Sequence, residues 1–442
     1  MSFKDSIERL KKGMNLAPME SGMNPENERT IPYQSAFSNF ADFPEYKDFT
    51  TMQWYYENQK YTKNQFLKHI GSSDATVDLE GRKLINYSSY NYLALACDER
   101  VKNAAIRAVE TFGASTGAGR SITGEIDLHQ EFENTVCDVL GTEDAVVSVG
   151  GYSTNAFTIG YLCRPQDLII YDELIHNSAI VGCKMTSSKR LSFPHNDYET
   201  LDRLLAQNRN KHERVLILAE GVYSMDGDIP DVPRLIEIKK RHKALLMVDE
   251  AHSMGVIGPN GLGVVDYFGL NASDIDILYG SMSKAFGTCG GYVAGPKPLI
   301  AILKNYAPGV LLYGAAPTPA NTAAGLESLR IMRAEPERAR RVQANAAYFI
   351  EKAREAGLNT YNSRDSGVVP IITRDSEVAL WLSIQLFDLG ICSFPMLFPI
   401  VPRDKSRLRF FLNTNHTKEQ IDYTIKCLSD CLAKAPKSKG IM

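Results

Sequence analysis

Short apolar runs alternate with amphipathic helical stretches through the middle of the chain, from about residue 80 to about residue 330. Because a strand–helix–strand alternation produces parallel strands with helices on both faces of one sheet, we expect an α/β fold with a mostly parallel sheet. Helical patterns such as ETLDRLLAQNR and VPRLIEIKKRH separate several of the runs. The runs are DAVVSVG, DLIIYD, RVLILAE, ALLMVDEA, IDILYG and GYVAG.

Two further helices and a strand pair are predicted ahead of these runs. The stretch VKNAAIRAVETFG has an amphipathic pattern that Gly113 ends. Its expected apolar face consists of Val101, Ala105, Val109 and Phe112. LHQEFENTVCDVLG predicts the next helix, and TVDLEGRKLINYSS predicts a turn between two short strands.

Residues 1–75 lack this alternation, and we expect them to form an N-terminal extension or arm. Near the start, Phe3, Ile7, Leu10 and Met14 recur at heptad-like spacing among basic residues. A basic amphipathic helix of this kind could contact a membrane surface or a partner peripherally. The alternative, which we favour because the pattern is short, is an arm that packs on its own dimer or a frayed segment.

After about residue 330 the pattern changes to a long polar helix, AEPERARRVQANAAYFIEKAREAG, followed by short strands and a last helix. This change predicts a second, smaller α+β domain. We therefore expect a large domain over residues 76–328 and a small C-terminal domain over residues 329–442.

Charge and composition exclude several classes of protein. The chain has 442 residues, with 49 Lys and Arg against 52 Asp and Glu and a net charge of −3. Without an overall positive field, we expect no nucleic-acid partner. No run of 18 or more apolar residues appears, so we expect no membrane span. The eight cysteines include no CxxC pair and no secretory signal is visible, so we expect no metal site and a reducing, cytoplasmic compartment.

Polar side chains follow two of the apolar runs, where strands would end. In LLMVDEAHS, Asp249 and His252 come directly after a buried run. In ILYGSMSKAFGTCGG, Lys284 follows the run in a loop of small residues that includes Ser281 and Ser283. Ligands of open α/β sheets bind beyond the carboxyl ends of the strands, so these are candidate site residues. Such a lysine could form a Schiff base because desolvation lowers its pKa, and the hydroxyls could hold a phosphate.

Each of these residues also has a plainer interpretation. Asp249 could simply cap the next turn, or with His252 it could form a metal-ligand pair or half of a hydrolytic triad. Lys284 could be an ordinary lysine of a surface loop.

Two further places follow apolar runs. In VSVGGYSTNAF, Gly150 and Gly151 leave a run and open a helix, so their bare amides could face an anion. His176 in YDELIHNSAI could stack on an aromatic ligand, although a lone histidine is more often structural. The glycine-rich GASTGAGRSITG follows a helix rather than a strand, which excludes a dinucleotide-binding loop and favours a flexible loop bordering a ligand.

Eight segments from about residue 80 to 430 carry a family resemblance, taken in this order. They are NYSSYNYLAL, GAGRSITG, HNSAIVG, FPHND, EGVYSMDGDIP, VDEAHSMGVIGPNGLG, GSMSKAFGTCGG and RLRFFLNTNHTKEQID. Together they resemble the α-oxoamine synthases, a family of fold-type I enzymes that use pyridoxal 5′-phosphate (PLP), and the fifth and sixth are most similar to the serine palmitoyltransferase-like members. The resemblance implies a large PLP-binding domain with a seven-stranded, mostly parallel sheet, a smaller α+β domain, and a homodimer.

The resemblance implies catalytic roles for Lys284, Asp249, His176 and His252, and a cofactor-binding role for Ser224. Lys284 would bond to the PLP aldehyde and later transfer a proton, and Asp249 would pair with the ring nitrogen. His176 would stack on the ring, and His252 and Ser224 would contact the side of the ring that carries its oxygen.

The same resemblance implies how the phosphate and the substrate are bound. Arg409 in RLRF would clamp the substrate carboxylate, because a guanidinium suits bidentate pairing, and Asn91 would lie nearby. The phosphate and the nearby ring edge would contact Ser281, Ser283 and the amides of Gly151 and Tyr152.

Several positions depart from the family pattern. Ser281 replaces the usual threonine and keeps the hydroxyl. The segment that reaches the neighbouring subunit's phosphate reads YGAAPTP, in which Gly314 and Ala315 offer no side-chain donor and Thr318 could compensate. Leu397 stands where one sphingoid-forming subgroup carries an arginine.

The implied reaction is a decarboxylative condensation of an L-amino acid, with serine favoured over glycine or alanine, and a long-chain acyl thioester. It would yield an α-oxoamine such as 3-ketosphinganine, CO2 and a free thiol, which places this acyltransferase in sphingolipid biosynthesis. The acyl carrier would be coenzyme A or acyl carrier protein, and the long N-terminal segment is typical of members that we associate with acyl carrier protein. The alternatives are a PLP-dependent aminotransferase and a non-catalytic scaffold subunit, although a scaffold would be expected to lose Lys284 or Asp249.

Overall fold

The computed structural model describes residues 38–58, 66–398 and 400–436. The chain divides into two units, residues 1–63 and 64–442. The described part of the first unit contains a 3-10 helix, η3 (Phe40–Asp42), and the helix α2 (Pro44–Asn58). The predicted basic amphipathic helix near Phe3 lies outside the described residues, and the extension over residues 1–75 stays a prediction.

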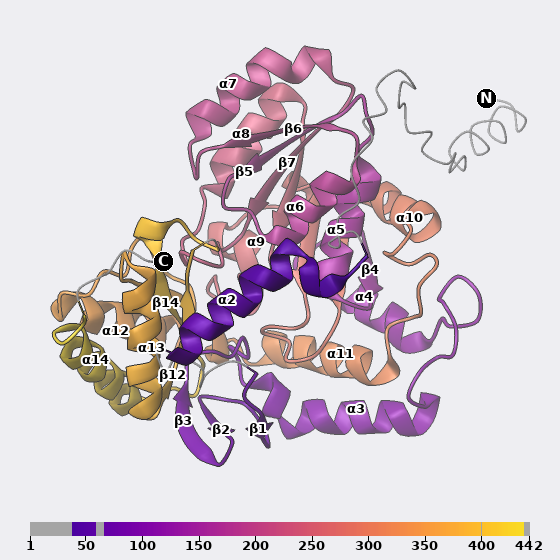
Figure 1. Cartoon of the computed structure of the whole chain (residues 1–442). Helices are drawn as coiled ribbons and strands as arrows, with labels where there is room; N and C mark the ends of the chain where they lie inside the picture. The colour runs from indigo at the N-terminus through magenta and orange to yellow at the C-terminus, as the bar shows by residue number, and fades with distance from the viewer. Residues whose placement is uncertain (1–37, 59–65, 399, 437–442) are drawn as a thin grey trace, which may run out of the picture. The chain divides into compact units, whose positions relative to one another are not determined.

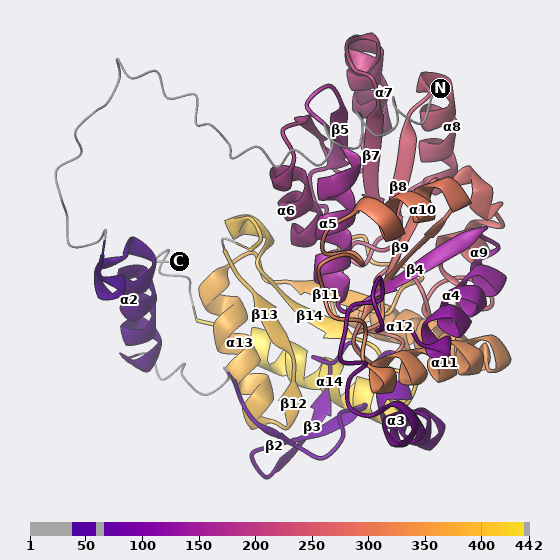
Figure 2. The same ribbon diagram turned by 90° about the vertical axis from the view of Figure 1, so that its right-hand side faces the viewer.

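The second unit contains a seven-stranded sheet in the order β4-β10-β9-β8-β7-β5-β6 (Figures 1 and 2). Neighbouring strands are parallel except for β10, which is antiparallel to both β4 and β9. The predicted mostly parallel sheet is therefore confirmed. Its strands are β4 (Asp144–Ser148), β5 (Leu168–Asp172), β6 (Lys189–Phe193), β7 (Val215–Glu220), β8 (Leu245–Asp249), β9 (Ile277–Ser281) and β10 (Gly291–Gly295).

Helices cover both faces of this sheet, which explains why its inner strands have continuous apolar sequences. One face buries Ile170, Ile217 and Val248 under α4, α7, α8 and α11. The other face buries Ile169 and Leu218. The helices α5, α6 and α10 cover this face (Figure 1). The helices are α4 (Asp127–Leu140), α5 (Gly151–Leu162), α6 (Asn177–Met185), α7 (Tyr198–Asn208), α8 (Val232–His242), α9 (Gly263–Phe268), α10 (Lys297–Tyr306) and α11 (Pro319–Ala334).

Side-chain caps fix where several of these helices begin. Asp197 accepts a hydrogen bond from the Thr200 amide at the start of α7, and Asp231 accepts one from the Arg234 amide at the start of α8. Such caps satisfy amides that have no partner within the helix, and each contributes about 1 kcal/mol. Short 3-10 helices complete the chain: η5 (Leu95–Cys97), η6 (Arg209–Lys211), η7 (Ala272–Asp274) and η8 (Arg403–Lys405).

The helix α3 (Glu99–Phe112) forms where predicted, but its predicted apolar face is partly wrong. Val101 is buried as expected, whereas Val109 is 42% exposed. The buried positions are instead Ala104 and Ala108, which pack with Ala323 of α11. Small side chains let the two helices approach closely, so packing rather than hydrophobicity decides which face of α3 is buried.

Strand β6 was not predicted from the sequence. Its residues KRLSF are mostly exposed, and β6 pairs only with β5 at the edge of the sheet. An edge strand needs fewer apolar side chains than a central strand, so it leaves a weak pattern.

A second core lies in the C-terminal part of the chain (Figure 2). A three-stranded antiparallel sheet, β11 (Val368–Ile372), β14 (Arg407–Phe411) and β13 (Phe394–Met396), packs with α12 (Glu337–Glu355), α13 (Ser376–Asp388) and α14 (Lys418–Leu432). The predicted smaller α+β domain is consistent with this core. The predicted boundary at residue 328 falls within α11 and stays a prediction.

A four-stranded sheet joins the beginning of the second unit to the C-terminal part. Its order is β1 (His69–Ile70), β2 (Thr76–Leu79), β3 (Arg82–Asn86) and β12 (Ile391–Cys392). The predicted turn between β2 and β3 is present, and Gly81 adopts a φ of +87° there. Among the described residues, no helix is long and apolar enough to cross a lipid bilayer.

Candidate active site

The predicted site residues follow the carboxyl ends of strands that run in one direction. Because β4, β5, β7, β8 and β9 run the same way, the loops after them meet at one edge of the sheet. These loops place Gly151 after β4, His176 after β5, Ser224 after β7, His252 after β8 and Lys284 after β9.

Asp249 and Lys284 lie close enough for their charges to interact. Asp249 is 6% exposed, and it accepts hydrogen bonds of 2.9 Å from the Asn155 amide group and from the Ala251 backbone amide. Burial raises the pKa of Asp249, and the charge of Lys284 opposes that rise. Burial lowers the pKa of the half-buried Lys284, and the carboxylates of Asp249 and Glu220 oppose that fall. A buried acid and an amine that loses its proton readily thus share one site.

Glu220 is a second buried acid in this site that sequence reasoning missed. It pairs in register with Asp249 across β7 and β8, and its Oε2 accepts a hydrogen bond of 3.2 Å from the Ser224 amide. Its Oε1 is buried without a partner, and burial, followed by the charge of Asp249, raises the pKa of Glu220. The signal was present, because Glu220 ends the run RVLILAE just as Asp249 ends ALLMVDEA.

His252 is buried between aromatic rings. The Tyr92 hydroxyl lies 2.8 Å from His252 Nδ1, and the Phe411 ring stacks on the imidazole at 6.1 Å with an angle of 7° between the planes. Burial lowers the pKa of His252 well below its usual value, so the ring is neutral. A neutral imidazole can accept or donate a hydrogen bond to a ligand without bringing charge into the site.

His176 caps the first turn of α6. Its Nδ1 lies 2.7 Å from the Ser178 hydroxyl and 3.3 Å from the Ser178 amide. Burial, followed by the positive charges of Lys284 and Arg409, lowers the pKa of His176 to about 4. His176 therefore presents a flat, neutral ring near Lys284, as stacking on an aromatic ligand requires.

The beginning of α5 forms a cradle with the end of β9. Helix α5 starts at Gly151, and no side chain caps it. A Cβ atom on Gly151 would lie 2.5 Å from Ser281 Oγ, so only glycine permits this close approach. The Ser281 and Ser283 hydroxyls are 2.8 Å apart. Uncapped amides at a helix N-terminus beside two hydroxyls provide donors suited to a phosphate.

Tyr152 and Thr318, the other predicted phosphate-site residues, have partners of their own. The Tyr152 side chain is half exposed, and its hydroxyl donates to Asn177 at 2.6 Å. The Thr318 hydroxyl accepts from the Asn321 amide at 3.3 Å and so caps α11. The contacts of the Tyr152 amide and of Thr318 with a phosphate stay predictions.

Arg409 extends from β14 into a buried position with spare donors. Its Nη1 donates to the Ser224 carbonyl at 2.8 Å, and its Nη2 donates to the Tyr90 hydroxyl at 3.3 Å. Its Nε is buried without a partner, and the guanidinium lies 4.5 Å from the centroid of the Phe411 ring. Burial lowers the pKa of Arg409 from its usual value. An unpaired buried donor is costly unless a ligand satisfies it, so the residue is suited to a carboxylate.

Asn91 is buried, and both ends of its side-chain amide form hydrogen bonds with nearby backbone groups. Its amide nitrogen donates to the Ser73 carbonyl at 3.1 Å, and its amide oxygen accepts from the Ala96 backbone at 3.2 Å. The neighbours Tyr90 and Tyr92, which sequence reasoning missed within NYSSYNYLAL, are the residues that contact Arg409 and His252. A contact of Asn91 with the substrate stays a prediction.

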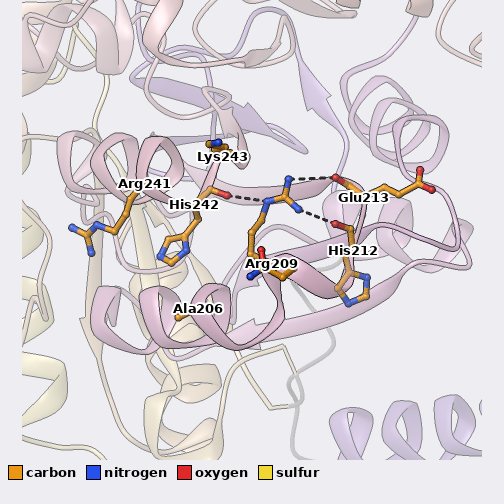
Figure 3. A pocket seen from close by; sticks show the side chains of 8 residues that line it. Ala206, Arg209, His212, Glu213, Arg241, His242 and Lys243 are labelled. Atoms are coloured by element: carbon orange, nitrogen blue, oxygen red, sulfur yellow. Dashed lines mark hydrogen bonds between the residues drawn. The ribbon is translucent and has the colours of Figure 1, made fainter.

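A separate pocket of about 530 Å3 lies where β7 and β8 begin, at the other edge of the sheet (Figure 3). A basic residue of its lining donates hydrogen bonds to backbone carbonyl groups at the ends of nearby helices. Arg209 donates to the carbonyl oxygens of His242 at 2.9 Å and His212 at 2.8 Å (Figure 3). Because helix C-termini carry partial negative charge, these cations have a structural explanation, and we assign the pocket no catalytic role.

Comparison with known proteins identifies the family. The model of the aminotransferase class I and II family matches residues 82–428. An 8-amino-7-oxononanoate synthase of Symbiobacterium thermophilum is 40% identical over 364 residues, which cover 82% of this chain and 91% of that relative. A solved serine palmitoyltransferase variant from S. paucimobilis with bound PLP and myriocin has a TM-score of 0.84 at 27% identity, covering 88% of this chain and 98% of that one. An 8-amino-7-oxononanoate synthase from Francisella tularensis has a TM-score of 0.68 at 25% identity, covering 79% and 98%.

The chain therefore belongs to the aminotransferase class I and II family, and within it to the α-oxoamine synthases, which are fold-type I enzymes. Its cofactor is PLP. The predicted family, fold and cofactor are confirmed. The predicted similarity to serine palmitoyltransferase is seen among the solved structures. The relatives found by sequence that are reported above carry the name 8-amino-7-oxononanoate synthase instead, so sphingolipid biosynthesis is not supported.

The described residues fit this cofactor. The α5 N-terminus and Ser281 offer donors for a phosphate, and the neutral His176 ring offers a flat surface for the pyridine ring. The Lys284 amine could bond to the aldehyde carbon, and the buried Asp249 carboxylate could hold a proton on the ring nitrogen.

Proposed function

We propose that this α-oxoamine synthase condenses L-alanine with an acyl thioester and releases CO2 and the free thiol. The choice of alanine rests on the relatives' name. In 8-amino-7-oxononanoate the amino group is on C8 beside the C7 ketone, so C8 and C9 match the Cα and methyl carbons of alanine. Carbons 1–7 then match the acyl group of a seven-carbon dicarboxylic acid. The thiol carrier would be coenzyme A or an acyl carrier protein.

The Arg409 guanidinium is the observation that supports an amino-acid substrate most strongly. It is buried beside Tyr90, with Nε unpaired, and its charge lowers the pKa of His176 and His252, which places it close to both. An α-carboxylate bound here would satisfy the spare donors and would hold the amino acid's Cα near Lys284.

Bound PLP supplies an electron sink for negative charge at the amino acid's Cα. In our proposal the protein's residues do the rest. Asp249 keeps a proton on the ring nitrogen, and Asn155 and the Ala251 amide keep the Asp249 carboxylate ionised and oriented. Lys284 Nζ removes the Cα proton and later returns it, since burial lowers its pKa and so favours the free amine. The Cα then forms a bond to the thioester carbonyl carbon, the thiolate leaves, and the α-carboxylate departs as CO2.

The test is a reaction of the PLP-loaded protein with L-alanine and pimeloyl-coenzyme A, followed by mass spectrometry. We expect an amino ketone nine carbons long, with one CO2 and one thiol released per molecule. A keto acid with no thiol release would instead identify an aminotransferase. No conversion of L-alanine here, nor of L-serine in the assay below, would favour the scaffold-subunit alternative.

A second candidate is the condensation of L-serine with a long-chain acyl thioester. The TM-score of 0.84 to serine palmitoyltransferase, against 0.68 to the Francisella 8-amino-7-oxononanoate synthase, favours it. The segment EGVYSMDGDIP favours it as well. The same assay with L-serine and palmitoyl-coenzyme A separates the two candidates, because each names a different pair of substrates.

We also infer that the active protein is a homodimer. Ile122 and Tyr313 are 79% and 85% exposed, and their two loops meet where the Ala316 amide donates to the Ala118 carbonyl at 3.1 Å. Exposed apolar side chains on adjoining loops favour coverage by another protein surface. Sedimentation equilibrium should give twice the chain mass of 49.1 kDa, and a single-chain mass would contradict the inference.

A further inference from the structure

His195 lies between two buried carboxylates, in the loop that follows β6. Its Nδ1 is 2.9 Å from Asp172 Oδ1, and its Nε2 is 3.0 Å from Asp228 Oδ2. Asn196 Nδ2 also lies 3.1 Å from His195 Nε2, but it donates to Asp228 Oδ2 at the shorter distance of 2.8 Å. Because ionised carboxylates only accept hydrogen bonds, each of the two carboxylate contacts calls for a ring N–H, which is the imidazolium form. Burial alone would lower the pKa of His195, but the two carboxylates raise it to about 10. His195 is therefore a fixed positive charge at neutral pH.

Asp228 belongs to the loop over residues 221–231, and β14 contacts the same loop. Asp226 forms a buried ion pair with Arg407, and Arg407 Nη1 also donates to the Met225 carbonyl at 2.9 Å. The loop is thus held by a cation at each end of the segment from Met225 to Asp228.

Arg409 contacts this loop at Ser224, the residue before Met225. Arg407 and Arg409 are two positions apart on β14, so they lie on the same face of the strand. Arg409 Nη1 donates to the Ser224 carbonyl at 2.8 Å. The position of this carbonyl therefore helps to set the direction of the guanidinium that our proposed function assigns to the substrate carboxylate.

We propose that His195 is a positioning residue for the amino acid's carboxylate. The imidazolium holds Asp228, Asp228 fixes the loop, and the loop's Ser224 carbonyl orients Arg409. This inference rests on the proposed function, in which Arg409 binds the carboxylate. The His195 ring touches Asp172, Asp228, the Asn196 amide group and the Tyr223 ring, which packs edge-on at 4.5 Å, and the His195 backbone amide donates to Glu173.

The same cluster has the spacing of a metal site, so metal binding is the alternative to the positioning role. Ligand atoms of His195, Asp226 and Asp228 all lie within 4.8 Å of one another. However, Arg407 already neutralises Asp226, and the proton on His195 Nε2 already faces Asp228. A metal ion would have to displace that proton and would then lie close to the guanidinium. The charges therefore favour positioning over metal binding.

The test compares two amines that differ only in the carboxylate. The PLP-loaded His195→Gln variant is titrated with L-alanine and with ethylamine, and binding is followed by the cofactor's absorbance. We expect the affinity for L-alanine to fall about tenfold, the scale of a lost hydrogen bond to a charged group. We expect the affinities for ethylamine and for PLP to stay near those of the wild type, because neither depends on Arg409.

Matched variants separate positioning from a general loss of structure. His242 also pairs with a carboxylate, Asp202 at 2.8 Å, but at the other edge of the sheet, so His242→Gln should change neither affinity. Arg409→Lys should weaken L-alanine binding at least as much, roughly 10- to 100-fold, while sparing ethylamine. If His195→Gln does not fold, Asp228→Asn removes the same ion pair and should give the same carboxylate-selective loss.

Three results would overturn the inference. An unchanged preference for L-alanine in the folded His195→Gln or Asp228→Asn variant would show that the ion pair does not orient Arg409. Equal losses for L-alanine and ethylamine would show a general structural effect. If the wild type itself showed no preference for the amine with a carboxylate, the proposed role of Arg409 would fail first, and the inference with it.

Discussion

Asn155 donates a hydrogen bond from its side-chain amide to Asp249, with Nδ2 2.9 Å from Oδ2. Asn155 lies on α5, the helix whose N-terminus forms the predicted phosphate cradle, and Asp249 ends β8. The bond therefore ties the two ends of the predicted cofactor site together. Because burial raises the pKa of Asp249, this donor favours the carboxylate form that a protonated ring nitrogen needs.

Replacing Asn155 should weaken cofactor binding. In Asn155→Ala the Asp249 carboxylate loses one donor, so its pKa should rise further. We expect the dissociation constant for PLP to increase about tenfold, or ~1.5 kcal/mol, as measured by fluorescence titration. Asn305→Ala is the control, because Asn305 donates only to the Ala301 carbonyl on the exposed surface of α10. An unchanged affinity in Asn155→Ala would show that Asp249 does not need this bond.

A methyl group on Gly151 should close the phosphate cradle. In Gly151→Ala the new Cβ would lie 2.5 Å from Ser281 Oγ, closer than real Cβ contacts. We expect PLP to bind at least about tenfold more weakly, while pyridoxal, which lacks the phosphate, is affected less. Gly160→Ala, in the same helix, is the control, since its Cβ would meet only the Met185 side chain, at 3.1 Å. Equal losses for PLP and pyridoxal would place the phosphate elsewhere.

Replacing Arg409 with lysine should weaken amino-acid binding while sparing the cofactor. Lysine keeps a positive charge but cannot form the two parallel hydrogen bonds of a guanidinium. We expect the KM for L-alanine to rise roughly 10- to 100-fold in Arg409→Lys, with the PLP affinity unchanged. The control is Arg340→Lys on the exposed side of α12. A normal KM in Arg409→Lys would mean that another residue binds the carboxylate.

The stability of the protein should depend on pH through His195. Its pKa is about 10 in the folded state, against 6.5 for a free histidine. A raised pKa means that the ion pairs stabilise the fold fully below about pH 6.5, and that this contribution is lost as the pH rises toward 10. The difference in unfolding free energy between wild type and His195→Gln should therefore shrink from pH 6.5 to pH 10. A constant difference across this range would contradict the assigned charge.

Position after a buried strand was the strongest sequence signal for the site. It identified Lys284, Asp249 and His252, because a polar residue that ends an apolar run is conspicuous in a single sequence. The same signal applies to Glu220, which was overlooked. Asn155 had no such signal, because it lies in the middle of a helix and is recognisable only through its contact with Asp249.

Contacts between residues far apart in the sequence were the features that the sequence predicted least well. Tyr90 and Arg409 are more than 300 residues apart, and neither residue's neighbours reveal that they meet. The buried face of α3 likewise depends on Ala323 of α11, which favours Ala104 over the larger side chain at position 109. Hydrophobic patterns report burial, whereas these features depend on which surfaces meet.

The bond between Lys284 and the cofactor is the central claim, and chemical trapping tests it most directly. The PLP-loaded protein is reduced with borohydride, digested, and analysed by mass spectrometry for the peptide that carries pyridoxyl phosphate. We predict that the label lies on Lys284 and that Lys284→Ala carries none, although its secondary structure is unchanged by circular dichroism. A label on a different lysine, or the same labelling in Lys284→Ala, would contradict the account.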